Sequence, residues 1–105
     1  MTLRVDLQII SDWIPDNAHV LDLGCGNGSL LKHLQQRNVT GYGLEIDNSK
    51  FSECIAGGVN VIQADLDEGL SQFGDQSFDF VILSQTLQAV KRPDFLLREI
   101  MRVGK

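Results

Sequence analysis

The sequence is poor in several features that would place it in a specialised class of protein. It has two cysteines and two prolines in 105 residues, and Cys25 and Cys54 lack the CxxC spacing and the neighbouring histidines of a zinc site. We expect two free thiols and no metal site. No run approaches the roughly 18 consecutive apolar residues of a membrane span, and residues 1–16 lack the order of a signal peptide. A cytoplasmic protein without a membrane partner is therefore predicted.

Basic residues are also scarce. Nine lysines and arginines stand against 14 acidic residues, which gives a net charge of −5. Binding to nucleic acid needs clustered lysine and arginine that displace counterions. The small basic groups at 91–92 and 98–105 are better explained as solvated helix faces and helix ends. No nucleic-acid partner is expected.

The composition that remains, 43% hydrophobic with ten glycines, is typical of one globular domain, which we assign to residues 1–105. Apolar periodicity predicts strands at 19–23, 41–46, 59–64 and 78–84. It predicts helices at 3–14, 29–37 and 67–73, one capped by Asn48 or Ser49 that stops at Gly57, and one that starts near Pro93. Strands that alternate with helices form βαβ units, so the predicted fold class is an open α/β, Rossmann-like parallel sheet.

A glycine-rich turn follows the first predicted strand in the stretch "HVLDLGCGNGSLLKHL". The dinucleotide fingerprint would need glycine at 24, 26 and 29, but position 29 is Ser29 and the third glycine is Gly28. Asp22 would repel a pyrophosphate and attract a ligand that carries an ammonium and a sulfonium. S-adenosylmethionine is such a ligand, and glycines would let the backbone approach its amino-acid end. The pattern favours this cofactor over NAD.

Three carboxylates lie near the carboxyl ends of the first three predicted strands. They are Asp22, Glu45 and Asp65. In an open parallel sheet these ends share one edge, where ligands bind. Glu45 is placed to accept both ribose hydroxyls, and Asp65 is placed to accept from the adenine amino group. The sequence therefore predicts a cofactor site at this edge.

Several segments carry a resemblance to a known family. "VLDLGCGNG", "GYGLEID", "VIQADL" and "FDFVILSQTLQ" resemble the successive motifs of class I S-adenosylmethionine-dependent methyltransferases. "GYGLEID" and "LSQTLQAVKRPDFLLREIMRVGK" resemble the MetW family of methionine biosynthesis proteins, and the likeness covers residues 3–105. The resemblance implies strand order 3-2-1-4, S-adenosylmethionine as cofactor with S-adenosylhomocysteine as product, and a role beside a homoserine O-acyltransferase.

The resemblance also implies which residues bind the cofactor, although it assigns no catalytic residue. These positions are Asp22, Gly24, Cys25, Gly26, Asn27, Gly28, Glu45, Ile46, Ala64, Asp65, Leu66 and Ser84. Two functions stay open: an S-adenosylmethionine-dependent methyltransferase of methionine biosynthesis, and a non-catalytic regulatory module that supports a homoserine O-acyltransferase.

Members of the resembling family continue past "RVGK", so the domain is expected to be truncated before its fifth strand. The strand at 78–84 would then lie at the edge of the sheet with an unpaired backbone. Its run "FVIL" lacks the proline, glycine and lysine that usually protect an edge. A homodimer through this strand is therefore predicted.

Overall fold

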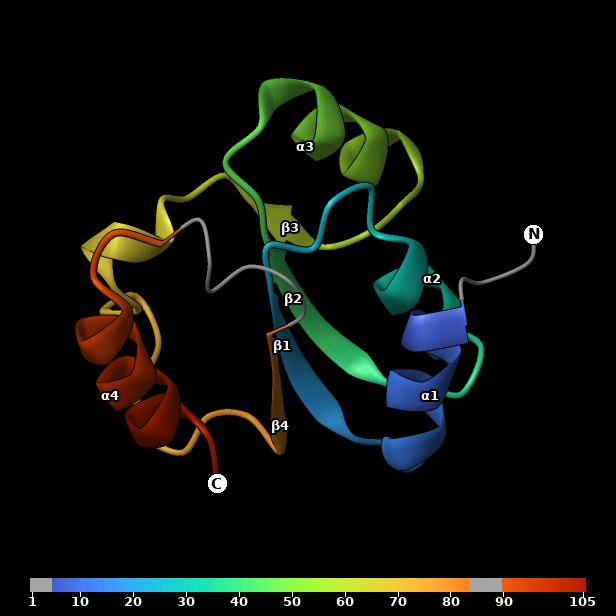
Figure 1. Cartoon of the computed structure of the whole chain (residues 1–105). Coiled ribbons are helices and arrows are strands. Elements are labelled where there is room, and N and C mark those ends of the chain that lie inside the picture. The colour runs from blue at the N-terminus through green and yellow to red at the C-terminus, as the bar shows by residue number, and fades with distance from the viewer. Residues whose placement is uncertain (1–4, 84–89) are drawn as a thin grey trace.

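The computed structural model describes residues 5–83 and 90–105, and it contains a four-stranded parallel sheet with helices on both faces (Figure 1). The strands are β1 (His19–Leu23), β2 (Thr40–Leu44), β3 (Val61–Ile62) and β4 (Phe80–Leu83). The helices are α1 (Val5–Trp13), α2 (Ser29–Gln35), α3 (Asn48–Ala56), the short 3-10 helix η1 (Leu66–Glu68) and α4 (Pro93–Val103). The strand order is β3-β2-β1-β4, so the predicted fold class and order are confirmed.

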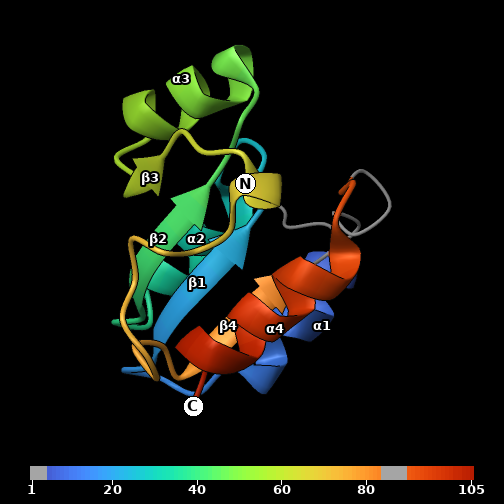
Figure 2. The ribbon, with the colours of Figure 1, turned by 90° about the vertical axis from the view of Figure 1, so that its left-hand side faces the viewer.

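The central strand β1 supplies side chains to both layers of the core. Val20 packs in the cluster on the side of α1, α2 and α3, whereas Leu21 and Leu23 pack in the cluster on the side of η1 and α4. Figure 2 shows α4 crossing the opposite face of the sheet from α2. Helices on both faces explain why β1 reads as a nearly continuous apolar run. Asp22 is the exception within that run, and it is buried.

The end of α1 is fixed by a side chain from beyond α2. The Arg37 guanidinium donates to the Ser11 carbonyl at 2.7 Å, to the Ile14 carbonyl, and to the Asp16 carboxylate at 2.8 Å. Carbonyls in the last turn of a helix have no partner within the helix, so these bonds satisfy them. One stripe of α1 faces the core, while Ile9 and Trp13 on the other stripe are exposed.

Several predicted boundaries differ from the structure, and three of them have a clear local reason. The helix cap is Asp47, whose carboxylate accepts from the Lys50 amide at 2.9 Å, and not Asn48 or Ser49. Strand β3 is shorter than 59–64 because the Val59 amide still bonds to the α3 carbonyl of Cys54 at 3.0 Å. The helix at 67–73 is reduced to η1, because Gly69 has φ +86° and ends it.

The outer edge of the fourth strand is partly covered by the chain itself. The predicted strand 78–84 is observed as Phe80–Leu83, and Ser84 lies outside the described residues. Phe78 forms a parallel bridge with Gly104: its amide donates to the Val103 carbonyl, and its carbonyl accepts from the Lys105 amide, both at 3.0 Å. The expectation of a bare edge is therefore wrong at Phe78, while self-association through Phe80–Leu83 stays a prediction.

Within residues 5–83 and 90–105, none of the helices has both the length and the apolar character that crossing a bilayer requires.

Gly41 of β2 lies very close to the backbone of β1. Gly41 has φ +141°, and a Cβ there would lie 1.8 Å from the Val20 carbonyl oxygen. Since Val20 belongs to the central strand, neither backbone can yield. Gly41→Ala should lower the free energy of unfolding by about 3 kcal/mol or more, measured by urea denaturation.

The matched control is Gly74→Ala, where the nearest atom to a new Cβ is the Ser77 hydroxyl oxygen at 3.4 Å. This variant should stay within about 1 kcal/mol of the parent. Equal unfolding midpoints for the two variants would contradict the packing described here.

Candidate functional site

The turn between β1 and α2 (Gly24 to Gly28, hereafter the glycine loop) is held on the end of β2 by backbone bonds. The amides of Gly24 and Cys25 both donate to the Leu44 carbonyl, at 2.8 and 3.1 Å. Gly24, Gly26 and Gly28 have φ values of 69°, 61° and 83°, which residues with a Cβ rarely adopt. A Cβ at Gly26 would meet no atom within 4 Å, so open space borders the middle of the loop.

Glu45 joins this loop to the start of α3. Its side chain is nearly buried, and its carboxylate accepts from the Gly26 amide at 2.8 Å and from the Asp47 amide at 3.0 Å. The structure therefore places Glu45 where the sequence predicted, at the carboxyl end of β2. Each carboxylate oxygen has a second lone pair, so the residue can still accept from a ligand.

Asp22 is the second acid beneath the loop. It is 3% exposed, and burial, with the nearby Glu45 charge as the smaller cause, raises the pKa of Asp22 to about 7. Among the ion pairs formed by residues 5–83 and 90–105, none includes Asp22 or Glu45. Two acids buried without a lysine or arginine form a site that favours a cation.

Asp65 lies at the same edge of the sheet but has a structural contact of its own. Its carboxylate accepts from the Asp67 amide at 2.9 Å and caps η1. The preceding Ala64 amide donates to the Glu45 carbonyl at 3.4 Å, which places this turn beside the end of β2.

The remaining predicted positions differ in surroundings. Ile46 is 59% exposed, Asn27 accepts from the Ser29 amide at 3.1 Å at the start of α2, and Leu66 packs in the core cluster beneath α4. Ser84 lies outside the described residues. The cofactor-binding role of all these positions stays a prediction.

Two residues at the site were missed by sequence reasoning. The Cys54 thiol of α3 donates to the Gly26 carbonyl at 3.1 Å, and the Gln63 amide nitrogen donates to the Ile46 carbonyl at 3.1 Å. Each lies far from its partner along the chain: Cys54 is in a helix without a motif, and Gln63 is in "VIQADL", of which only residues 64–66 were predicted to bind the cofactor. Folding brings Cys54 to the glycine loop and Gln63 to the turn before α3.

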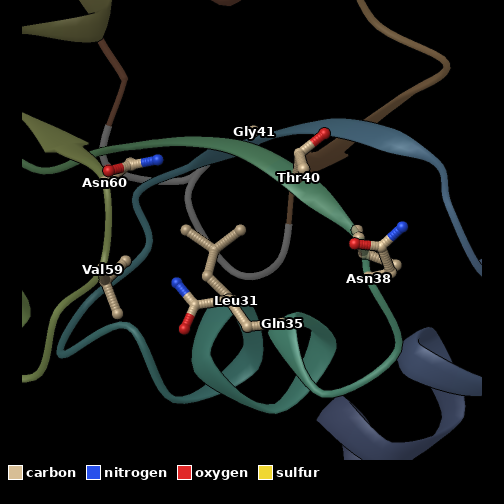
Figure 3. Close-up of a pocket in the computed structure, with 8 residues that line it drawn as sticks. Leu31, Gln35, Asn38, Thr40, Gly41, Val59 and Asn60 are labelled. Carbon is tan, nitrogen blue, oxygen red and sulfur yellow. The ribbon is translucent and has the colours of Figure 1, made fainter.

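A pocket of about 260 Å³ lies at a different place, on the α2 side of the sheet (Figure 3). It is lined by residues of α2, the start of β2 and the turn before β3, among them Gln35, Thr40 and Asn60. Thr40 begins β2 and Leu44 ends it, so this pocket lies at the opposite end of the strand from Glu45. Of the predicted cofactor-binding residues that the structure describes, none lines it.

Comparison with known proteins gives one family and one fold. The family model described as "Methionine biosynthesis protein MetW" matches residues 4–105. The "Bifunctional methionine biosynthesis protein MetXA/MetW" of Rhodopirellula baltica is 41% identical over 114 aligned positions, which cover 100% of this chain and 18% of that protein. The chain thus spans about a fifth of that curated relative.

Solved structures share the fold. A SAM-dependent methyltransferase from Archaeoglobus fulgidus is 25% identical with a TM-score of 0.85, over 95% of this chain and 46% of that one. The cyclase SpnF is 23% identical with a TM-score of 0.81, over 94% of this chain and 40% of that one. A methyltransferase and a cyclase therefore both contain this arrangement of strands and helices.

The buried state of Asp22 predicts a pH dependence of stability. Because its pKa is raised from 3.8 to about 7 on folding, its protonated form is favoured in the folded chain. The contribution of Asp22 to the free energy of unfolding is fully present below pH 4. It is lost as the pH rises through 7, on the order of 1.4 kcal/mol for each pH unit. Asp22→Asn should therefore be more stable than the parent at pH 7.5, and this advantage should vanish near pH 4.

Urea unfolding of both proteins across this range measures the difference. Asp12→Asn, a change at an exposed carboxyl of α1, serves as the control for net charge. A constant difference between Asp22→Asn and the parent at all pH values would show that folding does not raise the pKa of Asp22.

Proposed function

This chain belongs to the MetW family of methionine biosynthesis proteins, and on that premise we propose that its glycine loop binds S-adenosylmethionine. One observation carries the proposal. Two buried carboxylates, with no lysine or arginine paired to them among the described residues, lie beneath a loop whose central glycine borders open space. A cationic ligand that approaches bare backbone fits this arrangement.

The charges of the site match the parts of that ligand. Asp22 lies where the ammonium and sulfonium of the amino-acid end would compensate its charge, and such compensation favours the ionised carboxylate. Glu45 has lone pairs left for the two ribose hydroxyls, although it already accepts from the Gly26 and Asp47 amides. Asp65 is proposed to accept from the adenine amino group.

Methyl transfer is the reaction class that we assign to a bound acceptor, if one is taken up. When bound, the cofactor supplies an electrophilic methyl group on its sulfonium. The residues of the chain then act by alignment: the glycine loop holds the donor, and Glu45 fixes its ribose. The fold alone does not set this reaction, since SpnF has the same fold and is a cyclase.

A second candidate function is favoured by the relative from Rhodopirellula baltica, whose name joins MetXA to MetW in one bifunctional protein. Fusion of two proteins keeps them at high local concentration and is typical of proteins that work together. We therefore also propose a regulatory module that supports a homoserine O-acyltransferase of the MetX type. This function requires a bound partner but no methyl acceptor.

The cofactor proposal is tested by two glycines with the same local geometry. Gly26 and Gly58 have φ values of 61° and 77°, and a Cβ at either would meet no atom within 4 Å. Valine at either position should therefore cost a similar free energy of unfolding, on the order of 1–2 kcal/mol. Only Gly26→Val should fill the space beside the loop, and it should weaken binding of S-adenosylmethionine in calorimetry by about tenfold or more.

Gly58 follows the C-cap of α3 and is not among the positions predicted to bind the cofactor, so Gly58→Val should bind as the parent does. Normal affinity of a folded Gly26→Val would remove the glycine loop from the proposed site.

The two candidate functions are separated by one assay. A homoserine O-acyltransferase is measured with and without this chain, in the presence of S-adenosylmethionine labelled on its methyl group. The regulatory function predicts a rise in acyl transfer of about fivefold or more, with no label leaving the cofactor. The methyltransferase function predicts label on an acceptor and an unchanged acyl-transfer rate. Gly26→Val in the same assay shows whether a rise depends on the cofactor.

A further inference from the structure

Two thiols meet beneath the glycine loop. Cys25, within the loop, is partly exposed, and Cys54, on α3, is fully buried. Their sulfur atoms are 3.8 Å apart, which is van der Waals contact, although the residues are 29 positions apart in the sequence. Both are free cysteines, so a bond between them is chemically available.

The space around the two sulfurs is provided by glycines. A Cβ at Gly43 would lie 2.5 Å from the Cys25 sulfur, and a Cβ at Gly28 would lie 3.1 Å from the Cys54 sulfur. The Cys54 thiol also donates to the Gly26 carbonyl, so the pair contacts the central residue of the loop directly. A change at either sulfur would therefore be transmitted to the loop backbone.

We propose that Cys25 and Cys54 form a reversible disulfide that links the glycine loop to α3 and lowers the affinity of the site for its cofactor. The effect on affinity rests on the proposed function, whereas the disulfide itself does not. The oxidant is a small-molecule disulfide of the glutathione class. Exposure of Cys25 and burial of Cys54 set the order of the two exchange steps.

In the first step the Cys25 thiolate attacks one sulfur of glutathione disulfide and releases one glutathione thiolate. In the second the Cys54 thiolate attacks the Cys25 sulfur of this mixed disulfide and releases the second glutathione. The two protons lost by the cysteines are taken up by the two leaving thiolates. Two protein thiols are oxidised and one small disulfide is reduced, so the exchange is balanced.

The surroundings of the pair make this exchange slow and its product durable. Burial, followed by the Asp22 charge, raises the pKa of the Cys25 thiol, and burial also raises the pKa of the Cys54 thiol. Few thiolates are then present at neutral pH, which slows attack. The reduced pair also gains no stabilisation from an ionised thiol, the effect that makes some disulfides easy to reduce.

The disulfide would alter the loop. Its formation shortens the sulfur–sulfur distance from 3.8 Å to roughly 2.0 Å, and it removes the thiol proton that Cys54 donates to the Gly26 carbonyl. The amide nitrogen of Gly26 still donates to Glu45. A shift of this size in a loop that contacts the ligand through its backbone is enough to lower affinity by about tenfold.

The experiment incubates the folded chain with excess glutathione disulfide and follows its mass. The expected product has lost two hydrogens. After digestion without reductant, the peptides that contain Cys25 and Cys54 should remain linked by the disulfide. Calorimetry with S-adenosylmethionine should show about tenfold weaker binding for this product, with affinity restored by dithiothreitol.

Two variants test the assignment. Cys54→Ala should stop at a glutathione adduct on Cys25, and Cys25→Ala should stay unmodified because Cys54 is buried. Cys54→Ser replaces Cys54→Ala if the alanine variant unfolds.

Failure of the folded parent to form the internal disulfide would overturn the proposal. A disulfide without a change in affinity would overturn its regulatory part. Absence of binding in both the reduced and the oxidised chain would instead refute the proposed function, while the mass result would still decide whether the disulfide forms.

Discussion

The carboxylate of Glu45 holds together the glycine loop and the start of α3, the region that we propose as the cofactor site. A loop rich in glycine has few side chains to pack, so its conformation depends on where its backbone amides find acceptors. Here the Leu44 carbonyl accepts from two of them and Glu45 from a third. The second oxygen of Glu45 fixes the start of α3. One side chain thereby couples the first β-α turn of the sheet to the second.

Asp22 illustrates how such a site costs stability. A carboxyl that is 3% exposed beside another acid has its pKa raised to about 7. The contribution of Asp22 to the free energy of unfolding is therefore lower at neutral pH than in acid. An apolar residue at this position would continue the run of β1 and fill the core. A buried, unfavourable acid in an otherwise apolar strand is therefore evidence for a ligand more than for packing.

Much of the fold was readable from the sequence because it depends on local patterns. The parallel sheet followed from alternating elements, and Asp22, the glycine loop and Glu45 from their place at strand ends, whereas the strand order followed from the family resemblance. The boundaries were less accurate, since the end of β3 depends on a bond from Val59 to the preceding helix. The role of Cys54 could not be predicted at all, because its contact with the Gly26 carbonyl arises only when α3 folds onto the sheet.

The fit between Gly43 and the Cys25 sulfur also constrains how this sequence can change over time. A Cβ at 43 would lie 2.5 Å from the Cys25 sulfur and collide with it, and a Cβ at 28 would lie 3.1 Å from the neighbouring Cys54 sulfur, which is a tight contact. The Cβ at 43 would also lie 2.9 Å from the Cys25 Cβ and 2.9 Å from a Leu31 methyl, so position 43 can grow only after both neighbours have given way, and the reverse order passes through a damaged intermediate. At positions 25, 28, 43 and 54, the order in which substitutions arise therefore matters as much as their identity.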